Sequence, residues 1–153
     1  MTQLHKIIAT QEHEKHATHT GTQMHALLAK IHFSTTSPDN TDTPEITKKI
    51  KQTPDLAELF STQSKTEVPI AGTINGRFIS RRIDRLLIDH ATKTIKILDY
   101  KTDTNPDLRK NTYIAQINEY AQLLRAIYPT YTIFGYILWT HNFLLENIHV
   151  KAV

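Results

Sequence analysis

The sequence contains no cysteine, and only 4 of its 153 residues are glycine and 6 are proline. The lack of cysteine excludes a disulfide framework, a cysteine-ligated zinc finger and an iron–sulfur cluster. The low glycine and proline content excludes a collagen-like or linker-type chain, and a hydrophobic fraction of 39% excludes disorder throughout. What remains is a chain with the length of one globular domain.

Long apolar runs are also missing, since no stretch approaches the roughly 18 consecutive apolar residues that a membrane-spanning helix needs. The first residues include acids and histidines, which are not typical of a secretory signal. The 18 basic and 15 acidic residues give a formal net charge of +3, which alone does not indicate a nucleic-acid partner. We therefore expect a cytoplasmic protein with no membrane partner.

The first third of the chain predicts helices and one loop. Residues 1–19 are a polar segment, and we expect 20–153 to form a single domain. Apolar residues at helical spacing predict a helix from about Thr20 to His32. The segment 34–44, rich in Ser, Thr, Asp and Pro, predicts a loop. A second helix is expected to begin near Pro44, and the next proline to interrupt or restart it.

From Lys65 the hydrophobic period changes to that of strands. Two apolar runs separated by Asn75-Gly76 predict a hairpin, and its second strand, from Arg77 to Ile88, is long enough to bend or bulge. The rest of the chain predicts one strand, one helix and two closing strands, at 94–101, Thr112 to Tyr128, 132–139 and 143–150. This order of elements predicts a sheet flanked by helices.

Two charged residues end the third strand. Asp99 and Lys101 stand at i and i+2, so they share one face of the strand, with Cα atoms about 6.5 Å apart. A carboxylate here can hold a divalent metal, while the lysine can orient a water molecule or offset charge on a phosphate. The alternative is a strand end at which two opposite charges face water.

Asp84 is an acid in an otherwise apolar strand pattern. Burying it costs several kcal/mol unless it is paired or binds a metal. If the strands pair, Asp84 and Asp99 converge, and a cation such as Mg²⁺ relieves their repulsion. The alternative is a salt bridge to a neighbouring arginine, namely Arg81, Arg82 or Arg85.

Two helices carry polar residues on or beside apolar stripes. His25 adjoins the stripe of the first helix, where a lone histidine is more often a partly buried residue than a ligand. Gln116 and Tyr120 stand at i and i+4 on the later helix and project from one face. Gln116 is therefore expected to bond a strand end or to reach the site, whereas Tyr120 alone indicates core.

Six short segments together resemble the RecB-type branch of the PD-(D/E)XK nucleases: GTQMH, EVPIAG, RRIDRLL, ILDYKTD, QINEY and ILWT. The resemblance is closest to the C-terminal nuclease domain of the bacterial AddA helicase–nucleases, and it runs from about residue 20 to residue 148. It implies an α/β, restriction-endonuclease-like core in which a central mixed β-sheet is flanked by α-helices.

The resemblance also implies a reaction, namely hydrolysis of phosphodiester bonds in single-stranded DNA by a metal-activated water, with Mg²⁺ or Mn²⁺ as cofactor. It assigns the site residues as follows: catalytic Asp84, Asp99 and Lys101; metal-binding His25, Asp84, Asp99 and the backbone carbonyl of Tyr100; substrate-binding Gln116 and Tyr120.

The implied context is recombinational repair of double-strand breaks, with DNA, an AddA-type helicase portion and an AddB-type subunit as partners. The chain departs from the family in two respects. Arg81 stands where members usually have glycine, and the missing cysteines imply the branch without an iron–sulfur cluster. No ATPase motif of the type GxxxxGK[ST] occurs, so the resemblance is to the nuclease portion alone.

Two alternatives come from other functional classes. The first is a catalytically inactive nuclease-fold module that binds DNA or a partner subunit, and the second is a histidine-rich metal-binding protein, which rests on the N-terminal histidines. The presence of His25, Asp84, Asp99 and Lys101 together favours the nuclease.

Overall fold

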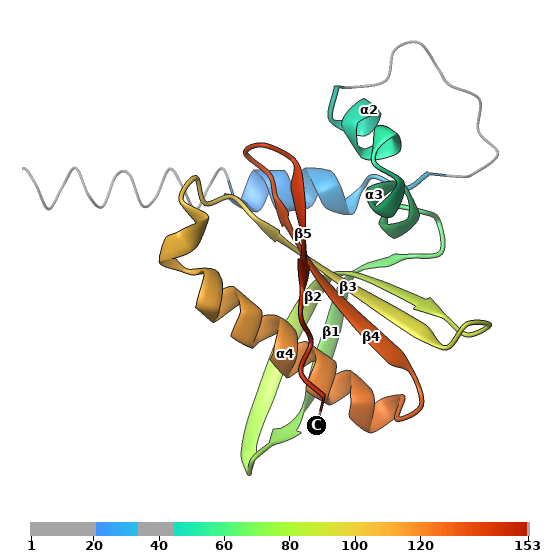
Figure 1. The fold of residues 1–153 in the computed structure, drawn as a ribbon, viewed down its shortest axis with the longest axis vertical. Coiled ribbons are helices and arrows are strands. Elements are labelled where there is room, and N and C mark those ends of the chain that lie inside the picture. Colours follow the sequence, from blue (N-terminus) through green and yellow to red (C-terminus); the bar gives the residue numbers. More distant parts are fainter. Residues whose placement is uncertain (1–20, 34–44, 153) are drawn as a thin grey trace, which may run out of the picture.

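The computed structural model describes residues 21–33 and 45–152. A five-stranded mixed sheet with strand order β1-β2-β3-β4-β5 forms its centre, and helices cover both faces of the sheet (Figure 1). The predicted α/β class is therefore confirmed. The polar segment predicted at 1–19 and the loop predicted at 34–44 lie outside the described residues. No helix in the described part of the chain is long and apolar enough to cross a membrane.

Three helical segments of the described chain come before the sheet, namely residues 21–29, α2 (Glu45–Gln52) and α3 (Pro54–Leu59). The first is shorter than predicted, because the helix ends at residue 29 and Phe33 then forms a bridge with Ser61. Pro54 begins α3, where its missing N–H costs no helical hydrogen bond. The prediction that this proline restarts the helix is confirmed.

The remaining elements are β1 (Lys65–Ile74), β2 (Arg77–Asp89), β3 (Thr94–Lys101), the 3₁₀ helix η1 (Pro106–Leu108), α4 (Lys110–Ile127), β4 (Thr132–Trp139) and β5 (Leu144–Ile148). Asn75 and Gly76 form the predicted hairpin turn, with φ of 50° and 76°. The pairing of β3 with β4 is parallel and the other pairings are antiparallel, because α4 carries the chain back across the sheet.

Some details differ from the sequence prediction. Helix α4 begins at Lys110 instead of Thr112, and its last residue, the apolar Ile127, is 60% exposed. Strand β5 is shorter than the predicted 143–150: the turn before it includes residue 143, and the strand ends at Ile148. Leu27 is 46% exposed, although it belongs to the apolar pattern of the first helix.

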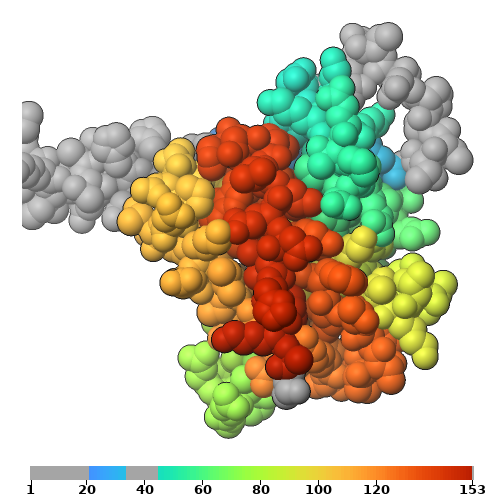
Figure 2. Space-filling model, viewed as in Figure 1, coloured from blue at the N-terminus to red at the C-terminus, as the bar shows by residue number. Residues whose placement is uncertain are grey.

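Each face of the sheet has its own hydrophobic core. Helix α4 covers one face, and its apolar side packs on Ile79, Ile83, Leu86, Ile95 and Ile97. Helix α4 lies so close to the strands that a Cβ on Gly135 would come within 2.5 Å of the Ile117 side chain. On the other face, Leu28 of the first helix, α2 and α3 pack on Leu98, Tyr100 and Leu138. Figure 2 shows the β4–β5 hairpin (red) on the viewed face, between the start of α4 and the α2–α3 pair.

At Asp84, strand β2 departs from the regular alternation of side chains between the two faces of the sheet. Ile79 and Ile83 face α4, but so does Leu86, which regular alternation from Ile83 would place on the other face. Across from this point, Glu67 of β1 has a left-handed φ of 53°. The expected irregularity of this long strand therefore occurs beside Asp84, and such irregularities re-aim side chains.

Candidate active site

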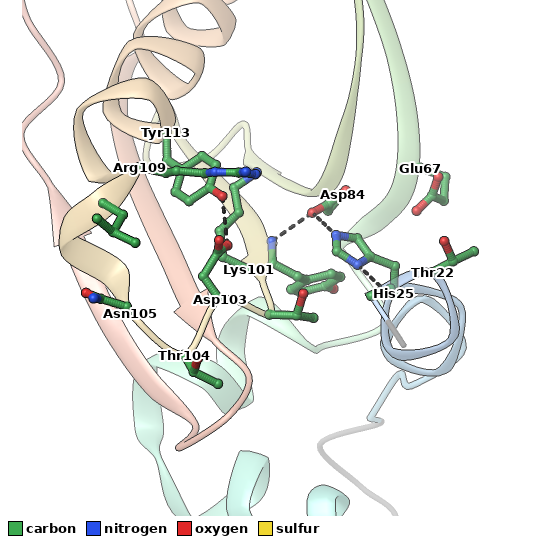
Figure 3. Close-up of a pocket in the computed structure, with 14 residues that line it drawn as sticks. Thr22, His25, Glu67, Asp84, Lys101, Asp103, Thr104, Asn105, Arg109 and Tyr113 are labelled. Atoms are coloured by element: carbon green, nitrogen blue, oxygen red, sulfur yellow. Dashed lines mark hydrogen bonds and ion pairs between the residues drawn. The ribbon is translucent and has the colours of Figure 1, made fainter. Parts of the chain in front are cut away.

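An open cleft of about 880 Å³ lies where β2 and β3 meet the first helix and the start of α4. Figure 3 shows two sides to this cleft. His25, Asp84 and Glu67 lie on one side, while Asp103, Arg109 and Tyr113 lie on the other. The cleft therefore collects residues from four separate parts of the chain.

Asp84 and His25 form the first ion pair of the site. The Nε2 atom of His25 lies 3.2 Å from Oδ2 of Asp84, and its Nδ1 donates to the carbonyl of Gly21 at 2.8 Å. The hydrogen bond to Asp84 is the main cause that raises the pKa of His25 to about 9, against the opposing effect of burial. The imidazole is therefore protonated and positively charged at neutral pH.

Asp99 and Lys101 form the second ion pair. Nζ of Lys101 approaches Oδ2 of Asp99 to 2.6 Å, but outside hydrogen-bond geometry, so this buried oxygen has no hydrogen-bond donor among the described residues. Burial, followed by the charge of Asp84, raises the pKa of Asp99 to about 6, although Lys101 acts in the opposite direction. Asp99 is only 3% exposed, and it does not line the cleft as Asp84, Tyr100 and Lys101 do.

Tyr100 connects the two pairs through its backbone. Its N–H donates to Oδ2 of Asp84 at 2.7 Å, which fixes the carboxylate against the end of β3. Its side chain points to the opposite face of the sheet, where it is fully buried and lies edge-on to the ring of His25. One oxygen of Asp84 therefore contacts both a backbone amide and an imidazolium.

Gln116 and Tyr120 hold Lys101 from α4. The Oε1 atom of Gln116 accepts from Lys101 Nζ at 3.1 Å, and its Nε2 donates to the hydroxyl of Tyr120 at 2.6 Å. That hydroxyl in turn donates to the backbone carbonyl of Arg82 at 3.1 Å. Tyr120 is 1% exposed, so these contacts orient the lysine, and the predicted contact of both residues with DNA stays a prediction.

Arg85 anchors the helix that carries His25. It is fully buried and donates to the carbonyls of Leu28 and Ile31 at 2.8 and 2.9 Å, at the end of the first helix. It also donates to the hydroxyls of Tyr100 and Ser64, both at 2.8 Å. The C-terminal end of a helix carries partial negative charge, so a cation placed there is stabilising. Asp84 and Arg85, neighbours in β2, thus contact the middle and the C-terminal end of one helix.

The alternative in which Asp84 pairs with a neighbouring arginine is not what the described residues show. Arg81 contacts Glu119 at 3.4 Å, and Arg82 contacts Glu67 at 3.2 Å. Arg85 has neutral partners and stacks 4.0 Å from the ring of Phe60. The acid of β2 instead takes its positive partner from the first helix.

The residue types of the site suit a divalent metal, but their present arrangement does not form a metal site. Within the described residues, no group of three or more His, Cys, Asp or Glu side chains is arranged to hold a metal ion. The acids are occupied by His25 and Lys101 instead. However, carboxylates are the ligands that Mg²⁺ and Mn²⁺ prefer, and the buried Asp99 oxygen lacks a hydrogen-bond donor.

Sequence reasoning predicted seven of these residues but missed Glu67, Asp103, Arg109 and Tyr113, and it considered Arg85 only as a partner of Asp84. Arg85 and Asp103 lie within the motifs RRIDRLL and ILDYKTD, so proximity to Asp84 and Asp99 was an available signal for both. Arg109 and Tyr113 carry no such signal, because the turn before α4 decides where they lie.

A comparison of the chain with protein-family models finds no match, and no curated protein matches it either. The geometry of the cleft therefore carries the functional argument.

Proposed function

We propose that this chain is a metal-dependent DNA nuclease of the RecB-like branch of the PD-(D/E)XK superfamily, which hydrolyses phosphodiester bonds of single-stranded DNA. The observation that carries the proposal is the convergence of two carboxylates, a lysine and a histidine at one end of the sheet, beside an open cleft. The three elements that supply them are far apart in sequence, and only the fold brings them together.

The metal would be held by the carboxylates of Asp84 and Asp99, by His25 and by the carbonyl of Tyr100. When bound, Mg²⁺ or Mn²⁺ supplies Lewis acidity and lowers the pKa of a bound water. The two ion pairs compete with this ion, because His25 and Lys101 now neutralise the acids that it needs. Metal binding therefore requires His25 to give up its proton and Lys101 to move away from Asp99.

Lys101 has the right chemistry for the second task of the site. Once released from Asp99, its ammonium group stays tethered by Gln116 and lies on the cleft side of β3. There it stabilises the negative charge that develops on a phosphate in the transition state, or orients the attacking water. Gln116 and Tyr120 keep this cation on the side of the cleft that faces α4.

The test separates metal binding from catalysis. We expect the protein to degrade single-stranded DNA with Mg²⁺ or Mn²⁺, and Asp99→Ala to abolish both Mn²⁺ binding, measured by calorimetry, and cleavage. Lys101→Met should abolish cleavage but keep or strengthen Mn²⁺ binding, because a competitor for Asp99 has been removed. Lys96→Ala is the matched control, since Lys96 lies on the same strand but pairs with Glu58. Absence of cleavage with either metal, alone and with helicase and partner subunits, would refute the proposal.

The biological setting belongs to the same proposal. Its implied partners are DNA, an AddA-type helicase portion and an AddB-type subunit, in cytoplasmic repair of double-strand breaks. Because no ATPase motif occurs in the chain, we expect low processivity from the protein alone. Addition of the helicase should lengthen the stretch of DNA degraded in each encounter.

One observation favours a second function, a catalytically inactive nuclease-fold module that binds DNA or a partner subunit. The acids are already neutralised within the protein, and no described group of three ligands is poised for a metal. Such a module would bind DNA equally well in chelator and in Mn²⁺. The nuclease instead requires Mn²⁺ to raise its melting temperature, and Asp99→Ala to remove that increase.

A further inference from the structure

One side of the cleft carries positive charge that the proposed chemistry leaves without a role. This side consists of Arg109, Tyr113 and the first turn of α4, and we call it the cationic wall. The guanidinium group of Arg109 lies near Tyr113, where it opposes the rise in the pKa of the tyrosine hydroxyl that burial and Asp103 cause. Nζ of Lys101 lies 4.2 Å from the centre of the Tyr113 ring. Arg109 and Lys101 therefore both border a single tyrosine (Figure 3).

Arg109 differs from the exposed arginines of β2. Arg77 and Arg82 each form a salt bridge, with Glu119 and Glu67 respectively. Arg109 is exposed, lines the cleft and forms no salt bridge with any residue in the described ranges. The nearby Asp103 instead accepts the hydroxyl proton of Tyr113 at 2.7 Å. The guanidinium of Arg109 thus keeps donors available for a ligand.

The start of α4 adds to the positive potential. The helix begins at Lys110 with no side-chain cap and no acid in its first turn. Lys110 itself pairs with Glu146. An 18-residue helix without an N-terminal acid leaves the positive end of its dipole uncompensated. This potential supports an anion already held by an arginine.

We propose that Arg109 binds the phosphate adjacent to the scissile one, so that the cationic wall is a second phosphate subsite. The inference rests on the proposed function, which places the scissile phosphate between the carboxylates and Lys101. An arginine suits this role, because its planar group donates two parallel hydrogen bonds to one phosphate. The preferred substrate is then a polynucleotide strand with several phosphates, and not an isolated phosphodiester.

The experiment measures binding of a fluorescent single-stranded oligodeoxynucleotide to the full chain in chelator, over a series of salt concentrations. Arg109→Ala should weaken binding about tenfold, as expected for the loss of one charge-assisted contact. It should also reduce the slope of log affinity against log salt by about 0.7, the value for one phosphate contact on a single strand. Arg109→Lys should keep the slope and lose part of the affinity.

The matched control is Arg125→Ala, which removes an arginine near the other end of α4, roughly 24 Å along the helix. It should leave both affinity and slope unchanged. With Mn²⁺, Arg109→Ala should raise KM for a long strand while kcat stays near that of the unaltered protein. A change in kcat alone would contradict a binding role.

The outcomes separate this inference from the proposed function. If the unaltered protein cleaves DNA while Arg109→Ala has the same affinity, salt slope and KM, the phosphate subsite is refuted and the nuclease stands. If the unaltered protein cleaves with neither metal, alone or with helicase and partner subunits, but Arg109→Ala weakens binding and lowers the slope, Arg109 is a DNA phosphate contact and the nuclease is refuted.

Discussion

Arg85→Met gives the sharpest test of how the first helix is held in place. The substitution keeps most of the side-chain volume but removes four hydrogen bonds from a fully buried position. The hydroxyl of Ser64 already donates to the carbonyl of Ser61 at 2.8 Å, so it keeps a partner. The carbonyl of Leu28 also keeps a partner, because it accepts from the backbone N–H of Ile31 at 3.2 Å. The carbonyl of Ile31 and the buried hydroxyl of Tyr100 lose the guanidinium that donates to them.

The magnitude follows from those acceptors. Leaving a buried acceptor unsatisfied costs about 1–3 kcal/mol, and two acceptors are affected, the carbonyl of Ile31 and the hydroxyl of Tyr100. Removing the guanidinium also removes its own desolvation cost, which offsets part of the loss. We therefore expect Arg85→Met to lower the free energy of unfolding by about 3 kcal/mol. Arg85→Lys should cost less, because its ammonium reaches some but not all of the same acceptors.

Urea denaturation followed by circular dichroism measures this change. The urea midpoint should fall while the m-value stays constant, since the variant and the wild-type protein expose similar areas when they unfold. Tyr100→Phe removes only the hydroxyl that Arg85 Nε contacts, and about 1 kcal/mol is expected for it. A loss below about 0.5 kcal/mol for Arg85→Met would refute the reasoning, because the contacts would then only balance the cost of burying the charge.

Three further predictions concern the site and the core. Burial raises the pKa of Asp99 to about 6, so its ionisation destabilises the metal-free fold progressively as pH rises from about 4 to 6, and fully above that. Asp99→Asn should therefore raise the free energy of unfolding at pH 7.5 by about 1–2 kcal/mol and change it little near pH 4, both in chelator. The stabilisation from protonated His25 is fully present below about pH 6.5 and is lost as pH rises through about 9. The free energy of unfolding of the wild-type protein should therefore drop over that range by up to about 2 kcal/mol, whereas that of His25→Gln should not. Gly135→Ala should lower the melting temperature, at a cost of about 1–3 kcal/mol, because its Cβ would lie 2.5 Å from the Ile117 side chain. Gly76→Ala has open space but a left-handed φ of 76°, so it should be destabilised by backbone strain and not by a clash. An Asp99→Asn variant less stable than wild type at pH 7.5 would show that the Lys101 contact outweighs burial.

Local signals in the sequence predicted most of the elements. The hairpin at Asn75-Gly76 and the strand at 94–101 occur where turn chemistry and alternation placed them. Pro54 restarts a helix through the geometry of its own backbone, so its effect does not depend on distant contacts. These features depend on neighbouring residues alone, which explains why they could be read without a fold.

The ends of elements were harder to predict, because distant contacts decide them. The first helix ends at residue 29 since Arg85, more than fifty positions later, takes its last carbonyls. The turn before β5 extends one residue into the predicted strand, since Phe143 has a left-handed φ of 56° and the Asn142 side chain accepts from the amide of Leu144. Neither feature leaves a signal in local periodicity.

The candidate site divides in the same way. Asp84, Asp99 and Lys101 stand out from an apolar strand pattern, so residue type alone marked them. Their partners could not be assigned, because the irregularity opposite Glu67 decides to which face Asp84 points. A pairing of Asp84 with an arginine of its own strand was reasonable from sequence. The imidazolium of His25 takes that place because the first helix crosses the end of the strand.

The charge balance of the site shows why it is costly to keep. His25 and Lys101 bring two positive charges, and Asp84 and Asp99 bring two negative ones, so the cluster is neutral without any ligand. Neutrality does not make it stable, because Asp99 is almost fully buried and one of its oxygens lacks a hydrogen-bond donor. Apolar residues of similar volume at these positions would fold at least as well. This cost, at a cluster beside an open cleft, supports the proposal that these residues serve chemistry and not the fold.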